Sequence, residues 1–63
     1  MRTGTVKFFN NDKGFGFITD NETNEDIFVH KTGIVEMIRE NDEVTFNTQA
    51  GQRGLNAVDV RRN

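Results

Sequence analysis

Flat aromatic rings recur at alternate positions in two short stretches of this chain. The first stretch carries Phe15 and Phe17, and the second carries Phe28 and His30. Because successive side chains of a strand point to opposite faces, each pair of rings would share one face of an extended strand. Rings held in this way offer π-faces on which another planar group can stack. Stacking is therefore the chemistry that these residues indicate.

The aliphatic residues of the same two stretches fall on the opposite face. Ile18, Ile27 and Val29 alternate with the rings, so they would face a core while the rings face water. Gly16 shares the core side and allows another backbone to approach closely. Phe8 could join the rings if a bulge or strong twist breaks the alternation near it. A sheet with its rings in water is unusual unless something stacks on it.

These rings require a small sheet to carry them. Polar, glycine-bearing turns separate five expected strands, over residues 3–10, 15–19, 26–30, 43–49 and 55–60. Short strands at fairly regular spacing, with no long helix, predict an all-β fold, a small closed or nearly closed five-stranded barrel. The alternation predicts antiparallel pairing. The clearest inward positions outside the ring-bearing stretches are Val6, Val44, Phe46, Val58 and Val60.

Three segments between or beyond these strands complete the expected fold. Residues 20–25 read as a polar, acidic hairpin loop, and residues 61–63 as a frayed basic end. Residues 31–42 form the longest segment without strand character. Their apolar residues would either plug one end of the barrel or, through the spacing of Ile34, Met37 and Ile38, form one or two helical turns with Thr32 as a cap.

The length and the net charge of the chain limit the number of domains and the ways in which it could bind a partner. The chain has 63 residues and a net charge of −2, from 8 lysines and arginines against 10 aspartates and glutamates. It is expected to form a single domain over residues 1–63. A protein that held nucleic acid by bulk charge alone would be basic. Nucleic-acid binding would therefore need local positive charge combined with stacking.

Catalysis and metal binding are poorly supported by the residues present. The chain contains no serine, cysteine or tyrosine, and its one histidine has no nucleophile to serve. No cofactor, metal or enzymatic activity is therefore expected. No apolar run approaches the ~20 residues of a membrane span. A cytoplasmic protein without a membrane partner is the simplest expectation.

The ring-bearing stretches resemble the two ribonucleoprotein-type motifs of the bacterial cold shock proteins. Lys13–Ile18 resembles the first motif and Ile27–His30 the second. Gly4–Asn10 near the start and the glycines around Arg53 also match, so the resemblance covers nearly the whole chain. It implies an antiparallel oligonucleotide-binding (OB-fold) barrel, a cold shock domain, that binds single-stranded RNA and DNA. Such a protein would be an RNA chaperone or a regulator of transcription or translation.

The resemblance also implies roles for individual residues. Base stacking is implied for Phe8, Phe9, Phe15, Phe17, Phe28 and His30. Phosphate contacts are implied for Lys7, Lys13 and Arg53. Asn10 and Asp26 are candidates for hydrogen bonds to base edges or for holding Lys7 in place. Lys31 stands where the family usually has an aromatic residue, and its stem could carry the ammonium group to a phosphate.

The aromatic surface has another reading. The exposed rings could form a dimer interface or bind a protein partner, which would make this chain a protein-interaction module. A core role for the rings would require Ile18, Ile27 and Val29 to face water, which inverts the simplest barrel. We expect a monomer that binds single-stranded nucleic acid.

Overall fold

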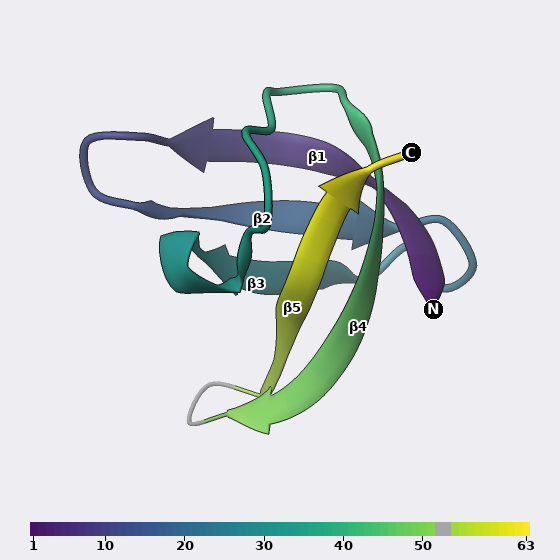
Figure 1. Cartoon of the computed structure of the whole chain (residues 1–63). Coiled ribbons are helices and arrows are strands. Elements are labelled where there is room, and N and C mark those ends of the chain that lie inside the picture. The colour runs from purple at the N-terminus through teal and green to yellow at the C-terminus, as the bar shows by residue number, and fades with distance from the viewer. Residues whose placement is uncertain (52–53) are drawn as a thin grey trace.

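The five predicted strands are present and close into a barrel. The computed structural model describes residues 1–51 and 54–63, and Figure 1 shows β1 to β3 side by side with β4 and β5 passing across them. The order around the barrel is β1-β2-β3-β5-β4. The elements are β1 (Arg2–Asn10), β2 (Phe15–Asp20), β3 (Asp26–His30), the 3-10 turn η1 (Lys31–Gly33), β4 (Glu43–Gly51) and β5 (Gly54–Arg62).

One pair of neighbouring strands departs from the expected antiparallel pairing. β3 and β5 are parallel, with Phe28 opposite Asn56 and Val29 opposite Ala57, whereas the other neighbouring pairs are antiparallel. This parallel pair closes the barrel. The prediction of an all-β, five-stranded barrel is confirmed, with this exception to its antiparallel pairing.

The core consists of the aliphatic residues that alternate with the rings, together with inward residues of β4 and β5. It contains Val6, Ile18, Ile27, Val29, Ile38, Val44, Phe46, Ala57 and Val60. The prediction for β5 was wrong at one position, because Ala57 is buried and Val58 only half-buried. Asp59 has a left-handed backbone (φ 54°), which interrupts the alternation between the two buried positions.

The predicted irregularity in β1 is a bulge at Lys7. Val6 lies opposite Ile18 and Phe8 opposite Phe17, so one extra residue separates these pairs. The bulge moves Phe8 to the face that carries Phe17. The neighbouring strand is close here: a Cβ on Gly16 would lie 2.8 Å from the Phe9 Cα. Only glycine fits at position 16.

The prediction of a frayed C-terminal end was wrong. Residues 61 and 62 belong to β5: Arg61 of β5 lies opposite Thr45 of β4, and the Asn63 N–H donates to the Glu43 carbonyl at 2.9 Å. The Arg62 N–H donates at 2.7 Å to the carboxylate of Glu36. Ladder hydrogen bonds to β4 therefore extend the last strand beyond its apolar residues.

Asp20 was expected in a solvated loop but is fully buried at the end of β2. Its carboxylate accepts hydrogen bonds from the Glu22 N–H and from the Arg2 guanidinium, both at 2.8 Å. These donors hold the pKa of Asp20 below its ordinary value. A charge can be buried at this position because it is paired and hydrogen-bonded.

Residues 31–42 cover one end of the barrel. Ile38 is buried and Ile34 packs against the core, as the plug reading predicts, but Met37 is 72% exposed. The helical alternative reduces to η1, which is capped by His30 rather than by Thr32. Within the described residues, no helix is long and apolar enough to cross a membrane.

Candidate nucleic-acid interface

Four phenylalanine rings gather on the outer surface of β1, β2 and β3, and we call this surface the aromatic face: Phe8, Phe15, Phe17 and Phe28. Phe8 lies 5.6 Å from Phe17 and 6.3 Å from Phe15 between ring centroids. Phe28 lies 6.0 Å from Phe15 and 5.8 Å from Phe17. Each ring thus contacts two others, at distances typical of favourable aromatic pairs. The rings orient one another while staying partly in water, since all four are half-buried or exposed.

His30 extends the aromatic face along β3. It lies opposite Phe15 in the register of β2 and β3, two residues beyond Phe28. The Thr32 N–H donates to Nδ1 of His30 at 3.3 Å, and the Thr32 hydroxyl lies 3.1 Å from the same nitrogen. These contacts at Nδ1 hold an exposed ring beside the other four. The geometry brings together five of the six residues predicted to stack.

The sixth, Phe9, lies elsewhere. It is half-buried and packs against the core, and its backbone lies opposite Gly16, whereas that of Phe8 lies opposite Phe17. The consecutive positions of Phe8 and Phe9 place their rings on opposite sides of the sheet. Phe9 therefore does not flank the aromatic face but reaches the end of the barrel.

Lys7 and Asp26 form an ion pair beside the aromatic face. The Lys7 Nζ lies 2.9 Å from Oδ2 of Asp26, and the Thr19 hydroxyl donates to Oδ1 at 3.3 Å. The hydrogen bond from Lys7 is the main cause that lowers the pKa of Asp26. Of the two roles considered for Asp26, holding Lys7 is the one that this geometry favours. The pairing leaves less of the Lys7 charge for a phosphate.

The turn between β1 and β2 positions two more lysines. The Asn10 side chain accepts the Lys13 N–H at 3.1 Å, and the Asn10 carbonyl accepts the Gly14 N–H at 2.7 Å. The Lys31 N–H donates to the Gly14 carbonyl at 2.8 Å. A Cβ on Gly14 would lie 2.9 Å from Cδ of Lys31, so the lysine stem lies against this turn. Asn10 therefore builds the turn that carries Lys13, and Lys31 lies across it. Arg53 lies outside the described residues.

A hollow of about 300 Å³ adjoins the aromatic face at Phe17 and Phe28. Its other walls include Glu25 and Leu55, and Leu55 is 44% exposed. Sequence reasoning missed both residues as part of the site. The parallel pairing of β3 with β5 places Leu55 there, next to the Asn56 that lies opposite Phe28. No local pattern in the sequence signals such a pairing.

The fold and the ring-bearing surface agree with comparison to known proteins. Residues 2–63 match the family described as "'Cold-shock' DNA-binding domain". The chain belongs to this family and is a nucleic-acid-binding domain of the cold shock type. The predicted family resemblance is confirmed.

Individual relatives support the same assignment. The chain is similar to the major cold shock protein of Micrococcus luteus, with 44% identity over 66 aligned positions that cover 98% of each chain. It is 48% identical to the cold shock-like protein CspG of Escherichia coli K12, over 92% of this chain and 89% of the relative. A solved structure described as "drosophila Unr CSD456" is similar with a TM-score of 0.79 and 28% identity, over 98% of this chain and 26% of the other.

Proposed function

We propose that this protein binds single-stranded RNA and single-stranded DNA by stacking unpaired bases on the aromatic face and His30. The observation that carries the proposal is the cluster of four rings outside a core that is already complete. Rings that contribute to a core are buried, whereas these keep contact with water. Each base stacked on an aromatic side chain contributes about 1–3 kcal/mol, largely whatever its identity.

Phosphates would be held at the margins of the aromatic face. Lys13 and Lys31 lie at the turn between β1 and β2. Lys7 of β1 lies beside Asp26 of β3. We include Arg53 on the basis of the family resemblance. A few such contacts position the strand, while the rings supply most of the affinity. This division suits a chain whose net charge is −2.

A binding mode of this kind favours open strands. A duplex keeps its base faces stacked on one another, so the aromatic face can bind only bases that are unpaired. The protein would trap RNA while it is open and delay its refolding into hairpins, as an RNA chaperone or a regulator of transcription or translation does. We place it in the cytoplasm as a monomeric binding protein without enzymatic activity.

Titration of a fluorescently labelled oligothymidylate tests the proposal, with anisotropy as the readout. Saturable binding that Phe17→Ala or Phe28→Ala weakens by about 1–3 kcal/mol supports stacking. If no oligonucleotide binds and the protein instead dimerises or captures a protein through the same rings, the aromatic face is a protein interface and the proposal is wrong.

A further inference from the structure

One nitrogen of the His30 ring is engaged with the chain, and the other is not. Nδ1 accepts the Thr32 N–H at 3.3 Å and lies 3.1 Å from the Thr32 hydroxyl. Nε2 makes no hydrogen bond to the residues that the structure describes. From this asymmetry we infer that His30 donates a hydrogen bond from Nε2 to a phosphate oxygen of the bound strand, and that Thr32 is the residue that positions this donor. The inference rests on the proposed function.

The contacts at Nδ1 decide where the neutral ring carries its proton. A neutral imidazole has one N–H and one nitrogen with a free lone pair, and the partner of each nitrogen sets which is which. A backbone N–H can only donate, so Nδ1 must present its lone pair to Thr32. The Thr32 hydroxyl then donates to Nδ1 as well. The proton of the neutral ring therefore lies on Nε2, which makes Nε2 a hydrogen-bond donor.

The same contacts set the direction of this donor. Thr32 belongs to η1, and His30 is the residue that caps η1. Nδ1 therefore faces the turn. The two nitrogens of an imidazole ring point in diverging directions, so the Nε2–H points away from η1. Because the His30 side chain is exposed, a ligand on the aromatic face can reach this N–H.

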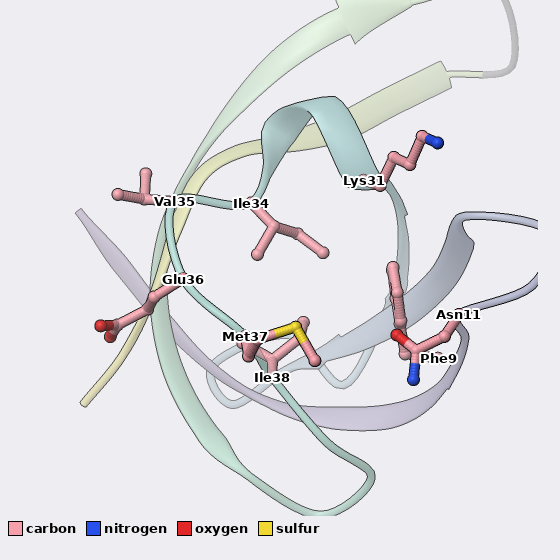
Figure 2. A pocket seen from close by; sticks show the side chains of 8 residues that line it. All are labelled: Phe9, Asn11, Lys31, Ile34, Val35, Glu36, Met37 and Ile38. Carbon is pink, nitrogen blue, oxygen red and sulfur yellow. The ribbon is translucent and has the colours of Figure 1, made fainter.

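Two lysines make a phosphate oxygen the expected acceptor. Lys31 directly follows His30, and Figure 2 shows its ammonium group pointing away from the centre of the cavity of about 490 Å³ that its stem lines. Lys13 precedes Gly14, whose carbonyl accepts the Lys31 N–H at 2.8 Å. Both cations thus belong to the segments beside His30 and attract phosphate to it. A hydrogen bond to an ionised acceptor is also stronger than one between neutral groups.

This donor role of His30 is separate from its stacking role. A base stacks on the flat face of the ring, whereas the Nε2–H lies in the plane of the ring, so one strand can use both. A phenylalanine at position 30 would still stack but could not donate. Thr32 would contribute to binding only through His30, since its hydroxyl is directed at Nδ1. These differences define the variants that test the inference.

Anisotropy titration with a labelled oligothymidylate measures the two contributions. His30→Phe keeps a flat ring and should weaken binding about two- to tenfold, the range for one hydrogen bond. Thr32→Val keeps the branched shape and the backbone N–H but loses the hydroxyl, and it should weaken binding about two- to fivefold. Thr32→Ser restores the hydroxyl and should bind as the unmodified protein does. Thr3→Val makes the same exchange at an exposed position near the start of β1 and should leave the affinity unchanged.

A double-mutant cycle tests whether Thr32 acts through His30. Thr32→Val should cause no further loss in a protein that already carries His30→Phe. An equal loss in both backgrounds would show that Thr32 acts independently of His30, and it would overturn the inference.

A second oligonucleotide identifies the acceptor. Oligodeoxyadenylate has the same phosphates as oligothymidylate but no base carbonyl, so His30→Phe should cause the same fold loss with both strands. A loss confined to oligothymidylate would make a base carbonyl the acceptor and overturn the assignment to phosphate.

NMR of the chain's one histidine, labelled with 15N, tests the tautomer without a strand. At about pH 8, where neutral histidine predominates in peptides, the spectrum should show a proton on Nε2 and none on Nδ1. A proton on Nδ1 would overturn the inference, as would unchanged binding by His30→Phe, and in both cases the proposed function would stand. If no strand binds the unmodified protein, the proposed function fails and this inference fails with it.

Discussion

Phe17 and Ile18 are neighbours on β2 that face opposite sides of the sheet, which makes them a stringent test of the two faces. Phe17 contacts Phe8 and Phe28 at centroid distances of 5.6 and 5.8 Å, whereas Ile18 is fully buried in the core. Phe17→Ala removes one stacking ring and should weaken oligonucleotide binding by about 1–3 kcal/mol. Ile18→Val removes one buried methyl group and should leave binding by the folded protein unchanged.

The stability of the two variants can be estimated in the same way. Phe17 makes two ring pairs, each worth about 0.5–1.5 kcal/mol, so the loss for Phe17→Ala should be about 1–3 kcal/mol. Because the rings stay partly in water, we expect a value toward the lower end of that range. Ile18→Val should cost about 0.5–1.5 kcal/mol through lost transfer energy and the cavity left behind. The two variants should therefore have similar free energies of unfolding and very different affinities.

Denaturant unfolding gives the stability of each variant, and anisotropy titration with a labelled oligothymidylate gives its affinity. The anisotropy titrations of both variants are run under conditions in which each variant is folded, so that the measured affinity refers to the native state. If Phe17→Ala lowers stability far more than Ile18→Val and binds the strand as tightly as the unmodified protein does, the assignment of the faces is refuted.

Three further predictions follow from particular contacts. Gly16→Ala places a methyl group 2.8 Å from the Phe9 Cα and should lower the free energy of unfolding by about 1–3 kcal/mol; unchanged denaturant unfolding would contradict the close approach of β1 and β2. The pKa of Asp20 is lowered in the folded state, so its stabilisation is present above about pH 4 and is lost as the pH falls through the folded pKa. Asp20→Asn should reduce the free energy of unfolding at neutral pH by about 1–3 kcal/mol, and this free energy should then fall less steeply as the pH is lowered. Asp26, whose pKa is also lowered, should account for part of the remaining pH dependence. An unchanged dependence of the free energy of unfolding on acid pH would show that Asp20 does not contribute. About three phosphate contacts predict a slope near −2 for log affinity against log salt, and a slope steeper than about −5 would mean that charge rather than stacking dominates.

The alternation of residue types made the sheet and the aromatic face predictable. Ile18, Ile27 and Val29 are buried as expected, and Phe17 lies opposite Phe28 on the other face. Both results follow from the two-residue period of a strand, which is visible in the sequence as the alternation of aromatic and aliphatic residues. The adjacent phenylalanines at 8 and 9 break that period, and the bulge at Lys7 is the structural consequence.

Features that depend on contacts between distant segments could not be read in this way. The parallel pairing of β3 with β5 brings Leu55 to the site, and an antiparallel expectation gave no reason to place it there. Asp20 looked like a loop residue because its partner Arg2 is distant in sequence. The left-handed backbone at Asp59 shifted burial from Val58 to Ala57. A residue's type does not reveal its tertiary partner.

The central claim is that the aromatic face binds bases that are not paired. It is tested most directly by titrating one labelled strand alone and after hybridisation to its complement, at the same salt concentration. Stacking on Phe8, Phe15, Phe17 and Phe28 predicts binding of the free strand and at least about a tenfold loss of affinity for the duplex. Equal affinity for both, or a preference for the duplex, would contradict the account.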